Sequence, residues 1–414
     1  MKTINEIGKA AKKASIYSAK LSSEEKNELL ISLADKLEAN AEEIIKINEE
    51  DVKKAKENGV KSAFIDRLTL DKDRVKDMAD GLRQVASLPD PIGEVVEMKT
   101  LPNGLQVGKK RVPMGVIGII FEARPNVTAD AFGLCLKAGS ATILKGGSNA
   151  LRTNTCLVDI FRKALEDEGA PADIVQLITD TSYDTANEMM RLNKYIDVLI
   201  PRGSGRLINS VVENSTVPVI KTGEGNCHVY VDESANLDMA EEIVINAKVQ
   251  RPGVCNAIET LLIHENIVEE FMLRITNELQ KHDVEVRGDE TFQRVEGVIP
   301  ATDEDFDTEY EDYIISAGVV KNLDGAIEHI RKYSTGHSEC IVTENYTNAQ
   351  RFLNEIDAAC VYVNASTRFT DGNQFGFGAE IGISTQKLHA RGPMGLKELT
   401  TTKYIIYGTG QIRK

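Results

Sequence analysis

The residues best suited to covalent chemistry lie in the segment QRPGVCN, residues 250–256. Pro252 and Gly253 place Cys255 on a turn, where a side chain can face a cleft. A helix starting there would lower the pKa of the Cys255 thiol through its N-terminal dipole, and the thiolate is the form that attacks acyl carbons. A small buried cysteine is the commoner explanation of such a residue. From this spacing alone, Cys255 is therefore more often a small buried residue than a nucleophile.

A second thiol, Cys227, precedes His228 in the segment GNCH and competes for the same role. Neighbours on an extended strand point to opposite faces, so these two side chains are not expected to meet. The six cysteines stand at positions 135, 156, 227, 255, 340 and 360, without a Cys-x-x-Cys pair. Structural zinc and a redox dithiol are therefore not expected. The histidines at 264, 282, 329, 337 and 389 lack metal-ligand spacing, so we expect satisfied surface or core residues and no metal.

Two glycine-containing turns are candidates for binding phosphate. The segments KGGS (145–148) and PRGSG (201–205) each follow an apolar run and open a helical pattern. Glycine lets the backbone approach a ligand, and a helix N-terminus favours phosphate. Each turn alone could equally be a phosphate-binding turn or only a tight connection between a strand and a helix. Two such turns on one sheet predict that the protein binds a nucleotide with phosphates. The G-x-G-x-x-G fingerprint of ordinary dinucleotide folds is absent.

Apolar periodicity predicts the elements that position these turns. Residues 1–90 read as helices that cover a larger domain, and strands alternate with helices from residue 113 onward. The alternation predicts an α/β fold with mostly parallel sheets covered on both faces. Residues 281–313 are acidic and give no clear element. The expected strands include 115–121, 141–145, 174–178, 196–200, 217–220, 228–231, 258–263 and 340–342, and the expected helices include 237–249, 266–280, 323–333 and 346–355.

Charge and hydropathy exclude some classes of partner. The formal net charge of −15 makes nucleic acid and anionic membranes poor partners. No apolar run approaches the ~20 residues that cross a bilayer, and the polar N-terminus lacks a signal-peptide core. We therefore expect a cytoplasmic protein. A polar hairpin is expected at 95–112, around the turn at 102–104, and could be solvated or could pair with another subunit.

Long motifs make the chain resemble the aldehyde dehydrogenase superfamily over nearly its whole length, and within it the reductases of γ-glutamyl phosphate. The motifs span residues 113–128, 225–232, 251–260, 378–386 and 388–396. The resemblance implies two doubly wound parallel-sheet domains plus a small oligomerisation hairpin. It implies a cofactor-binding domain (1–98, 113–234 and 366–398), a catalytic domain (235–365) and oligomerisation strands (99–112 and 399–414).

The resemblance also implies roles for individual residues. Cys255 becomes the nucleophile, and Asn126 becomes a candidate second donor to the oxyanion. The cleft for the dinucleotide is implied to be lined by Lys145, Ser148, Arg202, Gly203 and Ser204, with Glu309 holding the nicotinamide ribose. The substrate phosphate is implied to lie near Arg124 and Lys221.

Two positions depart from many relatives and refine the expected activity. Lys221 stands where aldehyde-oxidising relatives carry the glutamate that activates water, which favours acyl reduction. Ser148 stands where NAD-preferring relatives carry a carboxylate, and Lys145 can pair with a 2′-phosphate, which favours NADPH. The implied substrate is L-glutamyl 5-phosphate, in a homodimer or homotetramer functionally associated with glutamate 5-kinase. The alternatives are a reductase of another acyl phosphate or acyl-CoA, a cysteine hydrolase and a non-catalytic binding protein.

Overall fold

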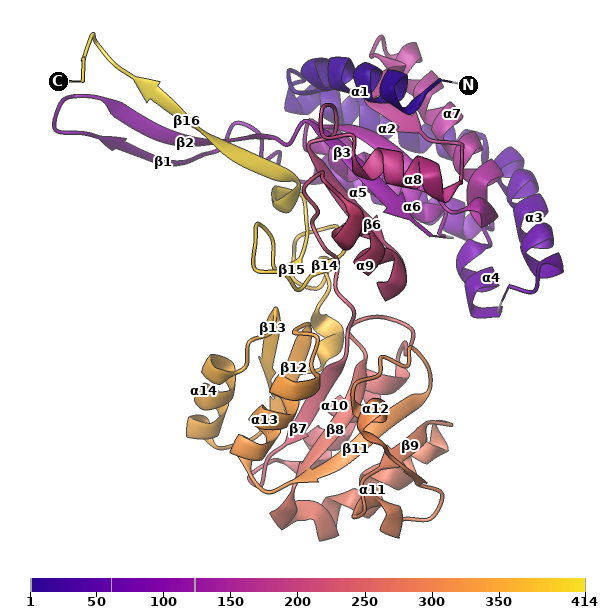
Figure 1. Cartoon of the computed structure of the whole chain (residues 1–414), viewed down its shortest axis with the longest axis vertical. Helices are drawn as coiled ribbons and strands as arrows, with labels where there is room; N and C mark the ends of the chain where they lie inside the picture. Colours follow the sequence, from indigo (N-terminus) through magenta and orange to yellow (C-terminus); the bar gives the residue numbers. More distant parts are fainter. Residues whose placement is uncertain (1, 61, 123, 414) are drawn as a thin grey trace. The chain divides into compact units, whose positions relative to one another are not determined.

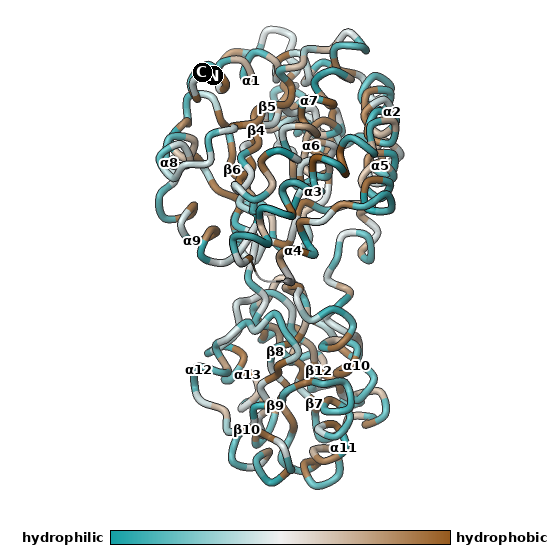
Figure 2. The backbone as a smooth tube through the Cα atoms, turned by 90° about the vertical axis from the view of Figure 1, so that its right-hand side faces the viewer, coloured by the Kyte–Doolittle hydropathy of each residue, from teal (hydrophilic) through white to brown (hydrophobic). Residues whose placement is uncertain are grey.

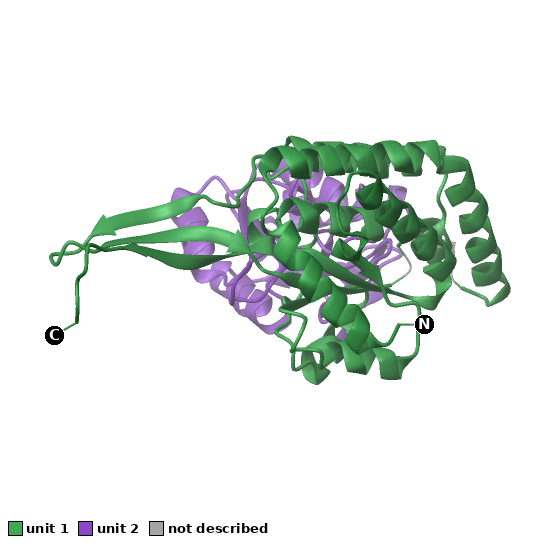
Figure 3. Cartoon of the chain, turned by 90° about the horizontal axis from the view of Figure 1, so that it is seen from above, with its two compact units in different colours: residues 1–221, 376–382, 394–414 green, residues 222–375, 383–393 purple. Residues whose placement is uncertain are grey.

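The computed structural model describes residues 2–60, 62–122 and 124–413 of the chain. These residues form two compact units, each with a sheet and a core of its own (Figure 3). The first unit comprises residues 1–221, 376–382 and 394–414, and the second comprises residues 222–375 and 383–393. Parallel sheets flanked by helices confirm the predicted α/β class.

The first unit opens with a helical layer, as the apolar periodicity predicts. Ser22 and Glu25 form the predicted capping box, in which each side chain accepts the other residue's backbone N–H. Leu30, Leu33 and Leu37 lie on the buried face of the same helix. The helices are α1 (Ile4–Ser18), α2 (Ser23–Ala39), α3 (Ala41–Glu57), α4 (Ser62–Leu68) and α5 (Lys72–Ser87).

A four-stranded parallel sheet, ordered β5-β4-β3-β6, forms the centre of the first unit (Figure 1). Strands β3 and β4 are buried along their whole length, as expected for a sheet covered on both faces. In Figure 2, the backbone tube is coloured by hydropathy, and hydrophobic residues lie along the strands of this sheet. The elements are β3 (Val116–Phe121), α6 (Asn126–Lys137), β4 (Ala141–Gly146), α7 (Leu151–Asp167), β5 (Val175–Leu177), α8 (Tyr183–Met190), β6 (Val198–Arg202) and α9 (Gly205–Asn214).

The second unit holds a seven-stranded sheet ordered β10-β9-β11-β8-β7-β12-β13, in which every pair is parallel. The acidic segment without a predicted element contains β9, β10 and α12. The strands are β7 (Cys227–Val231), β8 (Ile258–His264), β9 (Glu285–Gly288), β10 (Ile299–Pro300), β11 (Ile314–Val320), β12 (Ser338–Val342) and β13 (Cys360–Val363). The helices are α10 (Leu237–Val249), α11 (Val268–Lys281), α12 (Asp303–Phe306), α13 (Leu323–Tyr333) and α14 (Tyr346–Glu355).

The division between the units differs from the predicted boundary after residue 234. The predicted strand 228–231 is β7, which pairs with β8 and β12 in the second sheet, so the N-terminal segment of the first unit ends at Lys221. Residues 366–375 and 383–393 also belong to the second unit. The predicted strand 217–220 makes only a single parallel bridge, from Val219 to Leu199.

A three-stranded antiparallel sheet, β1-β2-β16, extends from the rest of the first unit (Figure 1). Its strands are β1 (Val95–Thr100), β2 (Gln106–Pro113) and β16 (Thr400–Tyr407). Every residue of β1 is exposed, and the two edge strands carry exposed apolar side chains. These are Val95, Val96, Met98, Tyr404, Ile406 and Tyr407. Within the described ranges, no helix is both long enough and apolar enough to span a membrane.

Candidate active site

Cys255 lies on a turn between α10 and β8 in the second unit and is partly buried. The turn is closed by the N–H of Ala257, which donates to the carbonyl of Val254 at 2.9 Å. No helix begins at Cys255, so the thiol does not lie at a helix N-terminus. Cys255 does lie on a turn, as Pro252 and Gly253 predict.

Gly225 packs directly against the backbone of Cys255. A Cβ atom at Gly225 would lie 1.5 Å from the carbonyl oxygen of Cys255, so only glycine fits. The N–H of Gly225 donates to Oε1 of Glu309 at 2.7 Å. Burial raises the pKa of Glu309 to about 7, against the opposing effect of the Gly225 hydrogen bond. The structure thus brings Glu309 to the segment that contacts the turn of Cys255, a contact that the sequence did not reveal.

The next residue of the turn, Asn256, is held by a loop that is distant in sequence. Its Nδ2 donates to the carbonyl oxygen of Thr370 at 2.9 Å, and its Oδ1 accepts from the guanidinium of Arg368. The hydroxyl of Thr367 donates to the carbonyl oxygen of Asn256 at 2.7 Å. Residues 366–370 therefore fix the turn from its C-terminal side.

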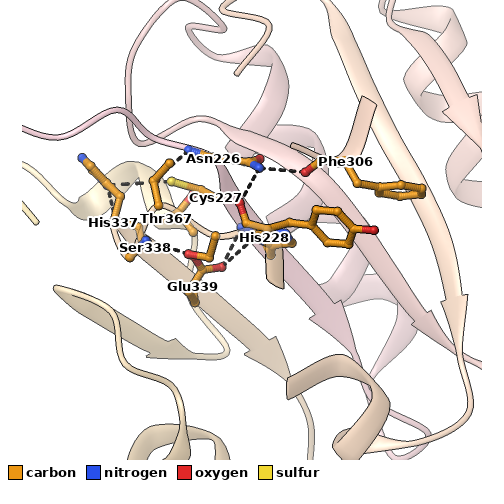
Figure 4. A network of polar contacts seen from close by, with 12 residues as sticks. Asn226, Cys227, His228, Phe306, His337, Ser338, Glu339 and Thr367 are labelled. Carbon is orange, nitrogen blue, oxygen red and sulfur yellow. Dashed lines mark hydrogen bonds and ion pairs between the residues drawn. The ribbon is translucent and has the colours of Figure 1, made fainter. Parts of the chain in front are cut away.

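Cys227 and His228 take different partners, as the alternation along a strand predicts (Figure 4). His228 Nδ1 lies 3.0 Å from Oε2 of Glu339, whereas the sulfur of Cys227 lies 3.2 Å from the carbonyl oxygen of Cys255. Burial raises the pKa of the Cys227 thiol well above its usual range, with Glu339 adding to the effect. A buried thiol that stays protonated is a poor nucleophile, which leaves Cys255 as the candidate.

The expectation of satisfied histidines is wrong for two of them. The Nε2 atoms of His329 and His337 are buried and have no hydrogen-bond partner among the described residues. Burial is the main cause that lowers the pKa of His329 to about 3 and that of His337 to about 4, so both rings are neutral at physiological pH. The described part of the chain contains no cluster of three or more His, Cys, Asp or Glu side chains suited to hold a metal ion.

The first phosphate-binding candidate follows β4 in the first unit. The side chain of Lys145 is buried at the carboxyl end of this strand, and desolvation lowers its pKa against the attraction of Asp180. Ser148 is exposed and begins a 3-10 turn, Ser148–Ala150, that leads into α7. A buried ammonium beside an exposed helical start is a donor set that suits a phosphate ester. Asp180 is a nearby carboxylate that the sequence reasoning did not include.

The second candidate, the turn between β6 and α9, already binds an internal carboxylate. Glu122 Oε2 accepts the N–H of Ser204 at 2.8 Å, and Oε1 accepts its hydroxyl at 3.1 Å. A Cβ at Gly203 would lie 2.6 Å from the same carboxylate. Glu122 was not among the residues predicted from the sequence, although it directly follows β3 and so lies at the edge where parallel sheets bind ligands.

The remaining predicted residues also lie in the first unit. Asn126 begins α6, and its Nδ2 donates to Oδ2 of Asp130 at 3.0 Å. Burial raises the pKa of Asp130 to about 6, against the opposing effects of Asn126 and Arg202. Arg124 and Lys221 are both partly buried. Asn126 and Cys255 belong to different units, so their joint use in an oxyanion hole stays a prediction.

Comparison with known proteins places these features in a family. Residues 1–294 match the model of the aldehyde dehydrogenase family. A γ-glutamyl phosphate reductase of Caldanaerobacter subterraneus subsp. tengcongensis is 60% identical over 407 residues, which cover 98% of each chain. A protein of the same name from Lachnospira eligens is 59% identical over 100% of both chains.

Solved structures agree with the sequence comparison. The crystal structure of γ-glutamyl phosphate reductase from Thermotoga maritima superposes with a TM-score of 0.96 at 51% identity, covering 99% of each chain. The propionaldehyde dehydrogenase of Rhodopseudomonas palustris, at 15% identity and a TM-score of 0.71 over 98% of this chain and 97% of its own, shares the fold. The chain therefore belongs to the aldehyde dehydrogenase family, among its γ-glutamyl phosphate reductases.

Proposed function

We propose that the chain reduces L-glutamyl 5-phosphate to L-glutamate 5-semialdehyde with NADPH and releases phosphate, a step of proline biosynthesis. The observation that carries the proposal is identity of 60% and 59%, over 98% and 100% of the chain, to relatives named γ-glutamyl phosphate reductase. Cys255 is partly buried, on a turn that is held by the hydrogen bond from Thr367 to Asn256, and this supports an acyl-transfer mechanism. Identity at this level argues against a reductase of another acyl phosphate or acyl-CoA.

The Cys255 thiolate attacks the acyl carbon and forms a thioester, while the C–O bond to phosphate breaks and phosphate leaves. The developing oxyanion is stabilised by the backbone N–H of Cys255 and by the side-chain amide of Asn126. Bound NADPH supplies the hydride that reduces the thioester. The resulting thiohemiacetal collapses to the aldehyde, and the thiol of Cys255 is regenerated.

Arg124 and Lys221 neutralise the phosphate of the substrate. Both are cationic and partly buried, and Lys221 is the last residue of the first unit's N-terminal segment, residues 1–221. A charged lysine at position 221 cannot take a proton from water, so hydrolysis of the thioester is disfavoured. This property suits a reductase, whose thioester must survive until it is reduced.

The first unit binds the cofactor. Lys145 and Ser148 hold the adenosine 2′-phosphate, and the buried ammonium of Lys145 supports NADPH over NADH. Arg202, Gly203 and Ser204 border the rest of the dinucleotide. The Glu309 carboxylate, in the second unit, accepts hydrogen bonds from the nicotinamide ribose.

The three-stranded sheet β1-β2-β16 joins subunits in a homodimer or homotetramer. Exposed apolar side chains on both of its edge strands support this role, because unpaired edge strands readily pair with another chain.

The second unit supplies the catalytic thiol. The reaction takes place in the cytoplasm, in functional association with the glutamate 5-kinase that makes the labile acyl phosphate.

The test is a coupled assay in which glutamate 5-kinase, ATP and glutamate generate the substrate in place. NADPH consumption that requires both the kinase and this protein, and that is lost in Cys255→Ala, supports the proposal. NADPH consumption with an acyl-CoA but not with the kinase system would instead identify an acyl-CoA reductase. Retained turnover in Cys255→Ala would contradict the mechanism.

A further inference from the structure

The second thiol of the GNCH motif touches the backbone of the nucleophile. Cys227 is the first residue of β7, and its side chain is fully buried. Its sulfur lies 3.2 Å from the carbonyl oxygen of Cys255, in hydrogen-bonding geometry. A carbonyl oxygen can only accept, so the thiol must be the donor.

The surroundings of Cys227 keep this donor in place. Burial raises the pKa of the thiol, and the nearby carboxylates of Glu339 and Glu309 act in the same direction. The sulfur also lies 3.8 Å from Nδ1 of His337, a ring nitrogen that is 2.8 Å from the hydroxyl of Ser338. The S–H group is therefore retained at neutral pH.

The same carbonyl is enclosed by a set of contacts that hold the turn. The backbone of Gly225 packs against it and leaves no room for a side chain. Glu309 fixes Gly225 through its N–H, and Thr367 binds the carbonyl of the following residue, Asn256. The hydrogen bond from Cys227 adds a directional contact to the peptide that joins Cys255 to Asn256.

We propose that Cys227 is a positioning residue whose thiol donates to the carbonyl oxygen of Cys255 and orients the backbone from which the nucleophilic sulfur projects. The proposal rests on the role proposed for Cys255. The two thiols that compete for one function in the sequence then have complementary functions. Cys255 reacts, and Cys227 fixes the geometry of attack.

The test compares Cys227→Ala, Cys227→Ser and the matched control Cys340→Ala in the full-length protein. Cys340 is a fully buried cysteine of the adjacent strand β12. For each variant, the rate at which iodoacetamide alkylates Cys255 is followed by peptide mass spectrometry from neutral to alkaline pH, alongside kcat and KM. Alkylation needs neither substrate nor cofactor, so it tests positioning even if the proposed substrate is wrong.

Cys227→Ala should lower both kcat and the alkylation rate of Cys255 by about three- to tenfold, the effect of one neutral hydrogen bond. The KM for NADPH should stay unchanged. Cys227→Ser keeps a donor and should retain most of the activity, and Cys340→Ala should behave as wild type. Wild-type alkylation in Cys227→Ala, or equal losses in the alanine and serine variants or in the Cys340 control, would overturn the proposal.

Discussion

At the residue scale, Glu122 is the carboxylate with the clearest consequence for cofactor binding. It accepts hydrogen bonds from the amide and the hydroxyl of Ser204 at the start of α9, the donors that we propose for the cofactor. Removing its charge should therefore strengthen NADPH binding. We expect Glu122→Gln to lower the Kd for NADPH by about three- to tenfold, because two like charges no longer compete for one site.

Fluorescence titration with NADPH measures this effect. Glu213→Gln, at an exposed position on α9, is the matched control and should leave the Kd unchanged. Weaker binding in Glu122→Gln would mean that the carboxylate is itself a ligand of the cofactor.

Glu309 should make stability depend on pH. Its pKa is raised from 4.5 to about 7 by burial, so between these values the folded state binds more protons than the unfolded chain. Stability therefore falls as pH rises through this window. Glu309→Gln cannot ionise and still accepts the N–H of Gly225. The free energy of unfolding of this variant, relative to wild type, should increase between about pH 5 and about pH 8.

Chemical unfolding at the two pH values tests this dependence. Glu290→Gln, at an exposed position of the same unit, controls for loss of a surface charge. An equal difference between Glu309→Gln and wild type at both pH values would show that Glu309 titrates normally.

The sequence predicts Cys255 as the nucleophile but gives no sign of the residues that contact its turn. The turn residues Pro252 and Gly253 made the cysteine a candidate, and only the long family motifs made it the preferred nucleophile. The contacts of Cys227 and Glu309 with the turn and its flanking segment join residues far apart in sequence. No local pattern reports such contacts, so these supports could not be predicted.

At the element scale, helices with strong caps were the most predictable. The bounds predicted for 237–249, 323–333 and 346–355 are those of α10, α13 and α14. Each begins after an asparagine whose side chain accepts backbone N–H groups of the first turn. The boundary predicted after residue 234 placed strand β7 in the cofactor-binding domain, whereas β7 pairs with β8 and β12 of the second sheet. An apolar run carries no information about its partners.

The cap of α10 gives a prediction for stability. The side chain of Asn236 accepts the N–H groups of Asp238 and Met239, both at 3.1 Å. Asn236→Ala should lower the free energy of unfolding by about 1 kcal/mol. Asn236→Ser restores an N-cap and should recover most of the loss in urea unfolding. Unchanged stability in the alanine variant would contradict the assigned cap.

At the scale of the whole molecule, the described residues build two large parallel sheets and a separate antiparallel sheet, β1-β2-β16. The apolar side chain of Ile406 is 61% exposed on the edge strand β16. Exposure of this side chain to water is unfavourable unless another subunit covers it. Ile406→Lys should therefore shift the protein toward smaller species in sedimentation velocity. Thr401→Lys, at an exposed position near the base of the same strand, should not. An unchanged sedimentation profile for Ile406→Lys would argue against this edge as a subunit contact.

The reverse reaction tests the central claim most directly. The protein is mixed with L-glutamate 5-semialdehyde and NADP⁺, and NADPH absorbance is followed with and without inorganic phosphate. Formation of NADPH that strictly requires phosphate is the predicted result, because phosphate must resolve the thioester on Cys255. Formation without phosphate would mean that water resolves the thioester, which would contradict the role assigned to Lys221 and identify an oxidising aldehyde dehydrogenase instead.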